Sequence, residues 1–138
     1  MPYPPEIVQP ARDELTRAGF APLLTAEAVE GALAQEGTLL VVVNSVCGCA
    51  AGSARPGVVM AVSAPGPKPQ RLASVFAGED REAVARVREQ LEGFPPSSPA
   101  IALFVDGDLV FLMERRHIEG HGPDEIATAL ANAFATHC

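Results

Sequence analysis

The chain has 138 residues, a length typical of one domain. Its net charge of −7 and the lack of a Lys/Arg-rich run argue against nucleic acid, because phosphates would be repelled. Apolar runs such as residues 39–43 are far shorter than the roughly 20 residues of a membrane-spanning helix. The N-terminus lacks a secretory signal pattern. We therefore expect one cytoplasmic domain over residues 1–138 that binds neither nucleic acid nor membranes.

The first part of the chain predicts two helices and a buried strand. Apolar residues recur at helical spacing over residues 5–18, and Gly19 ends that helix. Thr25 is a suitable N-cap for a second helix, which Gly37 ends. Residues 38–44 (TLLVVVN) are continuously apolar and rich in β-branched side chains. That pattern is typical of a central strand that is buried on both faces.

The middle of the chain predicts a helix, a strand and a further helix. The first helix follows the segment SVCGC, residues 45–49, and Pro56 would kink it. The strand covers residues 71–77. Asp80 is a good N-cap for the next helix, which runs to about Glu92 before Gly93.

The last part predicts a β-hairpin and a closing helix. Residues 100–105 (AIALFV) form a third strand, and Asp106-Gly107 is a hairpin turn signal. Residues 109–113 then form a fourth strand, antiparallel to the third, and the final helix begins after Gly122-Pro123.

The order of these elements predicts an α/β protein with a thioredoxin-like fold. A right-handed crossover makes the first two strands parallel, and the hairpin adds two antiparallel strands. The result is a central mixed four-stranded sheet flanked by helices. The two N-terminal helices are additions to that arrangement.

Two cysteines lie where the buried strand ends and a helix begins. Backbone N–H groups and the helix dipole stabilise negative charge at that place, so a Cys47 thiolate is favoured near neutral pH. A thiolate is the species that attacks disulfides. Gly48 lets the backbone turn tightly and leaves the sulfur uncovered. A disulfide between Cys47 and Cys49 would close a small, strained ring, which predicts an easily reduced bond or a pair that rarely closes.

Other residues are expected near these sulfurs. By analogy with thioredoxin-like folds, a cis Ser98-Pro99 bond would lie against the active-site sulfur. The positively charged segment 115–120 would border the site, where it would steer an anionic thiol or stabilise a thiolate. Arg55 either faces solvent or lies near the thiolate, and His117 is either a solvated loop residue or a functional one.

The sequence resembles the bacilliredoxin family over most of its length. The resemblance lies in ARDELTRAGF (residues 11–20), in VVVNSVCGCAAGSARPGV (residues 41–58) and in SPAIALFVDGDLVFLMERRHIEG (residues 98–120). The Cys-Gly-Cys stretch is the most diagnostic part. Bacilliredoxins are thioredoxin-like proteins that remove bacillithiol, a small cytosolic thiol, from S-bacillithiolated proteins.

The resemblance implies roles for particular residues. Cys47 would attack the mixed disulfide, and Cys49 would resolve the resulting intermediate. It implies no bound cofactor. Bacillithiol would be the co-substrate, S-bacillithiolated proteins the clients, and a flavoprotein disulfide reductase the recycling partner. We assign substrate binding to four further residues: Gly48, Arg55, Pro99 and His117.

Two other functions remain open at this point. The strained cysteine pair also fits a general disulfide isomerase or oxidase. Alternatively, Cys47 and Cys49 would bind a metal ion together with His117, His121 or Cys138, although zinc sites usually use C-x-x-C spacing. Cys138, the last residue, is expected at the pole opposite the active site as an incidental surface thiol, rather than a resolving or dimer-linking one.

Overall fold

A mixed sheet of five strands, in the order β1-β3-β2-β4-β5, forms the centre of the structure. The structure is a computed structural model that describes residues 3–138. The strands are β1 (Ala21–Pro22), β2 (Thr38–Asn44), β3 (Arg71–Phe76), β4 (Ala100–Val105) and β5 (Asp108–Met113). The helices are α1 (Pro5–Thr16), α2 (Ala26–Ala34), α3 (Arg55–Ser63), α4 (Arg81–Glu89), α5 (Arg115–Ile118) and α6 (Pro123–His137), and a π-helical segment η1 (Ala50–Ala54) precedes α3.

The central strand, β2, is buried along its whole length, as its continuous apolar sequence predicts. It pairs in parallel with β3 and antiparallel with β4, so that both of its edges are hydrogen-bonded. Leu40 and Val42 pack into one apolar cluster, whereas Leu39, Val41 and Val43 pack into another on the opposite face. The alternation of side chains along a strand therefore gives the sheet two cores.

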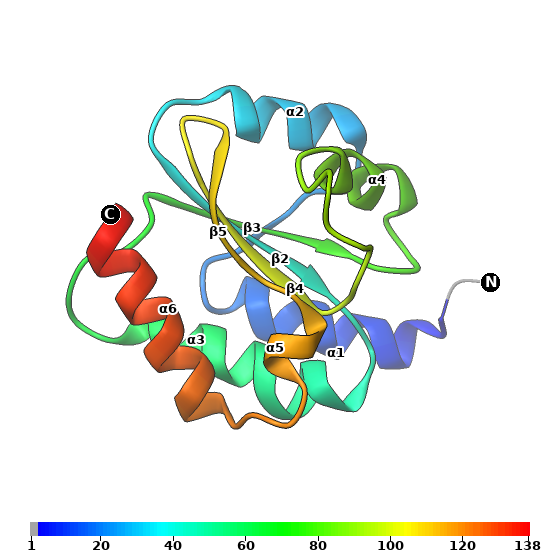
Figure 1. Cartoon of the computed structure of the whole chain (residues 1–138). Helices are drawn as coiled ribbons and strands as arrows, with labels where there is room; N and C mark the ends of the chain where they lie inside the picture. Colours follow the sequence, from blue (N-terminus) through cyan, green and yellow to red (C-terminus); the bar gives the residue numbers. More distant parts are fainter. Residues whose placement is uncertain (1–2) are drawn as a thin grey trace.

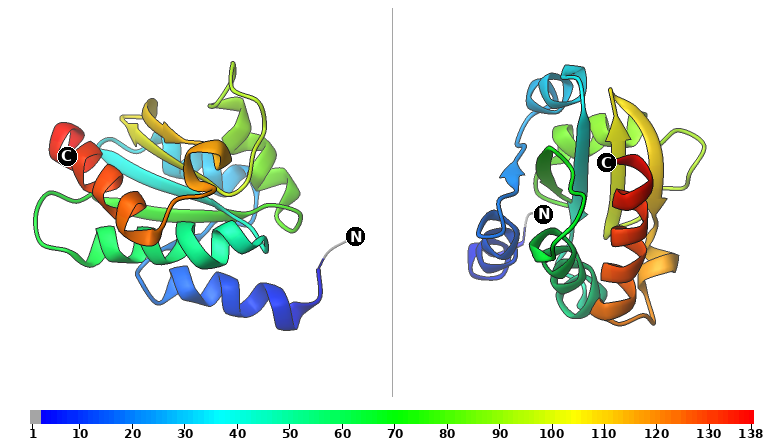
Figure 2. Two further views of the ribbon diagram at one scale, coloured as in Figure 1. Left: turned by 60° about the horizontal axis from the view of Figure 1, so that its bottom comes forward. Right: turned by 90° about the vertical axis from the view of Figure 1, so that its left-hand side faces the viewer.

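Helices cover both faces of the sheet. On one face α1, α3 and α6 surround a cluster that contains Leu15, Val58, Leu130 and Phe134. On the other face α2 and α4 pack against the sheet through side chains such as Val29 and Val87. The ribbon views show these two layers on opposite sides of the strands (Figures 1 and 2). Each fully buried Leu, Val or Phe contributes roughly 1.5–3 kcal/mol, so these clusters supply most of the driving force for folding.

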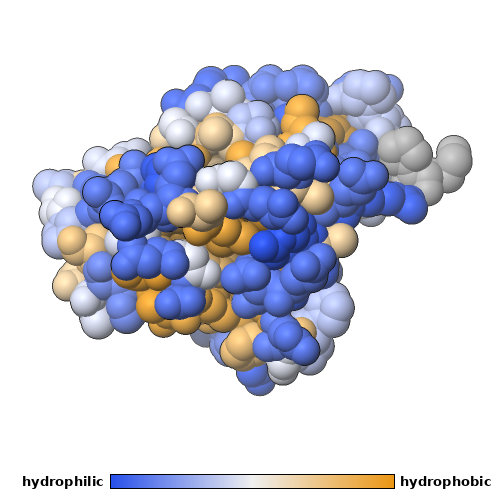
Figure 3. Space-filling view, turned by 90° about the horizontal axis from the view of Figure 1, so that it is seen from above, coloured by the Kyte–Doolittle hydropathy of each residue, from blue (hydrophilic) through white to orange (hydrophobic). Residues whose placement is uncertain are grey.

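The side of the molecule that carries α2 and α4 has a mixed surface. Apolar residues lie there among hydrophilic ones (Figure 3). Within residues 3–138, no helix is long and apolar enough to cross a membrane.

The predicted fold class is confirmed, with one correction to the sheet. The strands predicted over residues 38–44 and 100–105 have the predicted bounds. The sheet has five strands rather than the predicted four, because Ala21 and Pro22 pair in parallel with Ala73 and Ser74 at one edge. A two-residue strand that contains a proline has no alternation to detect and is tolerated only at an edge.

Several predicted boundaries differ from the structure by a few residues. The first helix ends at Thr16 rather than residue 18, and α4 ends at Glu89 rather than Glu92. Asp80 is the N-cap residue of α4, as predicted, but its carboxylate accepts hydrogen bonds from the Phe76 N–H and from Arg12. Arg12 therefore uses this carboxylate to join α1 to the turn after β3.

The helix after the cysteines contains a π-helical turn where a proline kink was expected. The Arg55 N–H donates to the Ala50 carbonyl, five residues earlier. Pro56 follows in the first turn of α3 and has no N–H to give the carbonyl four residues before it. The wider turn of η1 accommodates that missing hydrogen bond. Such π-helical turns are frequent at functional sites.

Candidate active site

The Cys-Gly-Cys segment lies at the end of β2, at the start of the helix that continues into η1 and α3. The Cys47 carbonyl accepts hydrogen bonds from the N–H groups of Ala50 (3.1 Å) and Ala51 (3.2 Å). Cys47 is therefore the N-cap residue of this helix, where unpaired backbone N–H groups gather.

The two sulfur atoms are in contact. Cys47 Sγ and Cys49 Sγ lie 2.7 Å apart, and both residues are free, half-buried thiols. Gly48 between them is exposed, and an added Cβ would meet no atom within 4 Å. The pair is thus open to a substrate on the side of Gly48. This glycine was predicted to contribute to substrate binding, and that role stays a prediction.

At Cys47, hydrogen bonds lower the pKa of the thiol by more than burial raises it. Burial raises the pKa of the Cys47 thiol, but hydrogen bonds from the Cys49 thiol and from Ser45 lower it. Backbone N–H groups at the helix start, those of Ala50 and Cys49, lower it further. The net pKa of Cys47 lies below the ordinary thiol value, so its thiolate is more populated near neutral pH than that of an ordinary cysteine.

The pKa of Cys49 is shifted in the opposite direction, above the ordinary thiol value. Burial raises the pKa of Cys49, and both its hydrogen bond to Cys47 and the negative charge there raise it further. The positive charge of Arg115 opposes these effects and lowers the pKa of Cys49. Cys47 is therefore the more easily ionised thiol of the pair, and Cys49 holds its proton more tightly.

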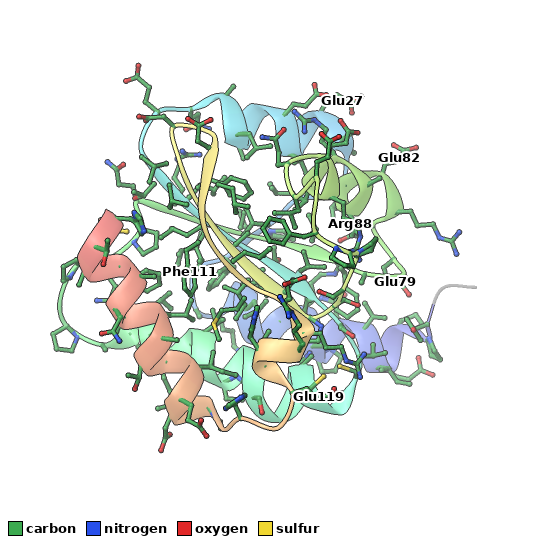
Figure 4. All side chains as sticks on the ribbon, viewed as in Figure 1. Glu27, Glu79, Glu82, Arg88, Phe111 and Glu119 are labelled. Atoms are coloured by element: carbon green, nitrogen blue, oxygen red, sulfur yellow. The ribbon has the colours of Figure 1, made fainter. Side chains whose placement is uncertain are left out.

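Arg115 stands at the start of α5, beside the loop that precedes Pro99. Its backbone N–H donates to Ser97 Oγ (3.3 Å), and its guanidinium donates to the Ser98 carbonyl (3.4 Å) and to Glu119 Oε2 (3.2 Å). Glu119 extends beyond α5 on the side of the molecule that carries η1 (Figure 4). Segment 115–120 thus brings one cation close to both sulfurs, as the charges predicted.

The Ser98-Pro99 bond is cis, and Pro99 is buried. The isomer agrees with the expectation from thioredoxin-like folds. The role of Pro99 in substrate binding stays a prediction.

Arg55 does not face solvent, which was one of its two expected positions. Only 6% of the residue is exposed, and its guanidinium bonds Glu14, Asn44 and the Ser45 carbonyl. Its Nε and one terminal nitrogen thus bind protein partners, and a substrate-binding role for Arg55 stays a prediction. The structure therefore places Arg55 beneath the cysteine segment, where it contacts the residues that lead to Cys47.

The two histidines between β5 and α6 hydrogen-bond at helix starts, and His117 lies in helix α5 rather than in a loop. His117 is exposed, and its Nδ1 accepts a hydrogen bond from the Glu114 N–H (3.0 Å) at the first turn of α5. His121 Nδ1 lies 2.7 Å from a carboxylate oxygen of Glu125 in the first turn of α6. A substrate-binding role for His117 stays a prediction.

Sequence reasoning missed two polar residues under the cysteine segment. Asn44 is 1% exposed, and its Oδ1 accepts from the Ser45 N–H at 2.8 Å. Ser45 is 8% exposed, and its Oγ accepts from the Cys47 N–H at 3.2 Å. A polar residue that ends an otherwise apolar buried strand is a usable signal, because such a group must find hydrogen-bond partners.

The third cysteine lies at the other pole, as expected. Cys138 is exposed and contacts Thr38, the first residue of β2, whereas Cys47 follows the end of that strand. Burial raises the pKa of Cys138, and the hydrogen bond with Thr38 lowers it in part. Across residues 3–138, no three His, Cys, Asp or Glu side chains form a group that could hold a metal ion.

The fold matches that of solved thioredoxins. Thioredoxin from Fasciola hepatica superposes with a TM-score of 0.60 at 20% identity, over 86% of this chain and 100% of that one. Oxidised mitochondrial thioredoxin 3 from Saccharomyces cerevisiae gives a TM-score of 0.58 at 15% identity, over 89% and 98% of the two chains. A thioredoxin fold with a cysteine pair at the N-terminus of a helix defines the protein as a thiol–disulfide oxidoreductase.

Sequence relatives identify the family. The family model described as "Disulphide isomerase" matches residues 3–138. A bacilliredoxin from Salinibacter ruber is 51% identical over 100% of this chain and 82% of that protein. A bacilliredoxin from Cytophaga hutchinsonii is 53% identical over 96% and 97% of the two chains. The chain belongs to the bacilliredoxin family.

Proposed function

We propose that this oxidoreductase removes bacillithiol from S-bacillithiolated proteins in the cytoplasm. The observation that carries the proposal is the asymmetry of the cysteine pair, in which Cys47 is the better nucleophile and Cys49 holds the proton beside it. A pair of this kind suits an exchange reaction in two steps, because each step needs one thiolate.

In the first step the Cys47 thiolate attacks the bacillithiol sulfur of the mixed disulfide. The disulfide bond of the client breaks, and the client cysteine leaves as a thiolate that takes up a proton. A new disulfide joins Cys47 to bacillithiol. In the second step Cys49 loses its proton and attacks the Cys47 sulfur, so that bacillithiol leaves and Cys47 and Cys49 form a disulfide.

The enzyme then needs two electrons to return to the dithiol form. Two molecules of free bacillithiol supply them in two successive exchanges and leave as bacillithiol disulfide, which a flavoprotein disulfide reductase reduces back to bacillithiol. No bound cofactor is required for either exchange step, because the reacting groups are all sulfur atoms.

The test uses a purified protein that carries one bacillithiol mixed disulfide. Cys47→Ala is expected to abolish release of the client thiol, because the attacking sulfur is missing. Cys49→Ala is expected to accumulate a bacillithiol adduct on Cys47, visible by mass spectrometry. Full activity of Cys47→Ala, or an adduct on Cys138 instead, would refute the proposed roles.

A general disulfide isomerase is the second candidate function, favoured by the description of the matching family model. The two functions differ in the substrate that reacts fastest. We expect faster reaction with a bacillithiol-linked protein than with a protein that contains scrambled disulfides. The opposite order of rates would favour the isomerase.

A further inference from the structure

One buried arginine connects helix α1 to the cysteine segment. Arg55 Nε donates to Glu14 Oε1 on α1 at 2.8 Å. One terminal nitrogen of the same guanidinium donates to Asn44 Oδ1 at 2.9 Å and to the Ser45 carbonyl at 2.7 Å. A single side chain therefore joins α1, the end of β2 and the turn that leads to Cys47.

Asn44 strengthens this connection. Its Nδ2 donates to the Ala11 carbonyl of α1 at 3.0 Å, while its Oδ1 accepts from both Arg55 and the Ser45 N–H. Removing a charge from water is costly, and a buried arginine is tolerated only when its donors find partners. The planar guanidinium satisfies this requirement with a fixed geometry that a lysine does not reproduce.

The hydrogen bonds of Arg55 and Asn44 continue through Ser45 to Cys47. The Cys47 N–H donates to Ser45 Oγ at 3.2 Å. The Ser45 side chain also hydrogen-bonds the Cys47 thiol, and this bond lowers the pKa of Cys47. The backbone of Ser45 is held on both sides, by Asn44 through its N–H and by Arg55 through its carbonyl. The position of the Ser45 hydroxyl beside Cys47 therefore depends on these two neighbours.

We propose that Arg55 and Glu14 are positioning residues for the thiol chemistry. They hold the turn at Asn44 and Ser45 against α1, and so keep Cys47 at the helix start with its hydrogen-bond donors in place. Helix α1, an addition to the thioredoxin-like arrangement, is then part of the active-site support. For its reaction this inference rests on the function proposed above, whereas the state of the Cys47 thiol is measurable without it.

The chain offers a matched control for this proposal. Arg12 also joins α1 to the body of the protein, through two hydrogen bonds to Asp80 at 2.9 and 3.2 Å, and lies over the ring of Phe76. Its contacts are at the end of β3 and in the turn that follows. Arg12→Lys therefore weakens the attachment of α1 without removing a hydrogen bond to Asn44, Ser45 or Cys47.

The experiment compares Arg55→Lys with Arg12→Lys in the full chain. The pH profile of Cys47 alkylation is read by mass spectrometry of its peptide, alongside the thermal midpoint and the rate of client release. Arg55→Lys is expected to raise the pH midpoint of Cys47 alkylation and to slow client release by roughly tenfold, the scale of a small misplacement of reacting groups. Arg12→Lys is expected to lower the thermal midpoint but to leave the profile unchanged.

Glu14→Ala provides a second variant if Arg55→Lys does not fold, because Glu14 is partly exposed and alanine is a good helix former. It is expected to shift the profile in the same direction by a smaller amount. An unchanged profile in the folded Arg55 or Glu14 variant, or an equal shift in Arg12→Lys, would overturn the proposal. If the protein proved not to remove bacillithiol, the effect of Arg55→Lys on Cys47 alkylation would still be measurable. Failure of the proposed function and failure of the positioning role are therefore distinguishable.

Discussion

In the proposed reaction cycle, Cys47 and Cys49 exchange roles once Cys47 has reacted. Before reaction, Cys49 donates a hydrogen bond to Cys47 and is held protonated by the negative charge there. Once the sulfur of Cys47 is part of a mixed disulfide, it carries no negative charge. Two of the influences that raise the pKa of Cys49 then disappear, and the positive charge of Arg115 remains. Formation of the intermediate therefore prepares the nucleophile of the next step.

The pKa shifts predict the order in which the three thiols react with an alkylating reagent. The pKa of Cys47 is lowered, whereas those of Cys49 and Cys138 are raised, so Cys47 has the largest thiolate fraction near pH 7. We expect it to be modified first, and the measurement is mass spectrometry of each cysteine peptide as a function of pH. Faster modification of the exposed Cys138 would contradict the assignment.

The same shift predicts a pH-dependent stability. The pKa of Cys47 is lower in the folded than in the unfolded protein, so its ionisation favours the native state. This contribution is fully present above the ordinary thiol pKa of the unfolded chain, and it is lost as the pH falls through the lowered value. For Cys49 the raised pKa gives the opposite sign, because stability is lost as the pH rises through it.

Arg115 is expected to act on the second step. Arg115→Ala removes a positive charge that lowers the pKa of Cys49, so resolution of the mixed disulfide should slow by about twofold to fivefold, as expected of a screened surface charge. The effect should shrink in high salt. Arg116→Ala is the control, because the Arg116 guanidinium pairs with Glu114. The decay of the bacillithiol adduct on Cys47 measures the step, and equal rates in both variants would refute this role.

At the residue scale, the sequence predicted those parts of the site that local patterns determine. A buried strand followed by Cys-Gly-Cys and a helix indicated where Cys47 lies and why its charge is stabilised. The direction of Arg55 was left open, because it depends on Glu14, 41 residues earlier in the chain. The spacing of residues along the chain does not reveal a contact between residues so far apart in sequence. The same is true of the contact between Arg115 and the loop before Pro99.

At the scale of elements, the sequence predicted the strands better than the short helices. The apolar runs of β2 and β4 gave their full extents, since residues in them face a core on either side of the sheet. The π-helical turn of η1 and the four-residue helix α5 were not predicted. Both are too short to show a hydrophobic period, and their form depends on hydrogen bonds to neighbouring segments.

The contact between α3 and α6 depends on one glycine. A Cβ added at Gly57 would lie 2.7 Å from Ile126 Cγ2 and 3.0 Å from the Pro123 carbonyl, so the two helices would have to separate. Gly57→Ala is therefore expected to destabilise the protein by roughly 1–3 kcal/mol, measured by urea unfolding.

Gly31 in α2 provides the control for that substitution. A Cβ there would meet no atom within 4 Å, and alanine is favoured over glycine inside a helix by roughly 0.5–1 kcal/mol. Gly31→Ala should therefore stabilise the protein. A stabilising Gly57→Ala would show that the helices are not in close contact.

At the scale of the whole molecule, the chain has two chemically distinct ends. Cys47 follows the last residue of β2, and Cys138 contacts Thr38 at its first residue. A seven-residue strand is about 23 Å long, so the two thiols are too far apart for direct exchange. The C-terminal cysteine is therefore separate from the proposed reaction cycle.

Cys138→Ser tests this separation. The variant is expected to release client thiol at the wild-type rate and to keep the alkylation profile of Cys47. A loss of activity, with accumulation of an adduct on Cys47, would instead show that Cys138 resolves the intermediate. Both readouts use the mixed-disulfide assay with full-length protein.

Strand β2 is hydrogen-bonded along both edges and covered on both faces, so its amide protons are expected to exchange with solvent only when the whole protein unfolds. Deuterium uptake should therefore be slowest along this strand and should rise abruptly beyond Ser45. The reactive thiols would then sit one turn away from the most slowly exchanging segment of the protein. Client proteins would then bind next to a rigid part of the backbone, and the conformational changes that disulfide exchange requires would have to occur in the client.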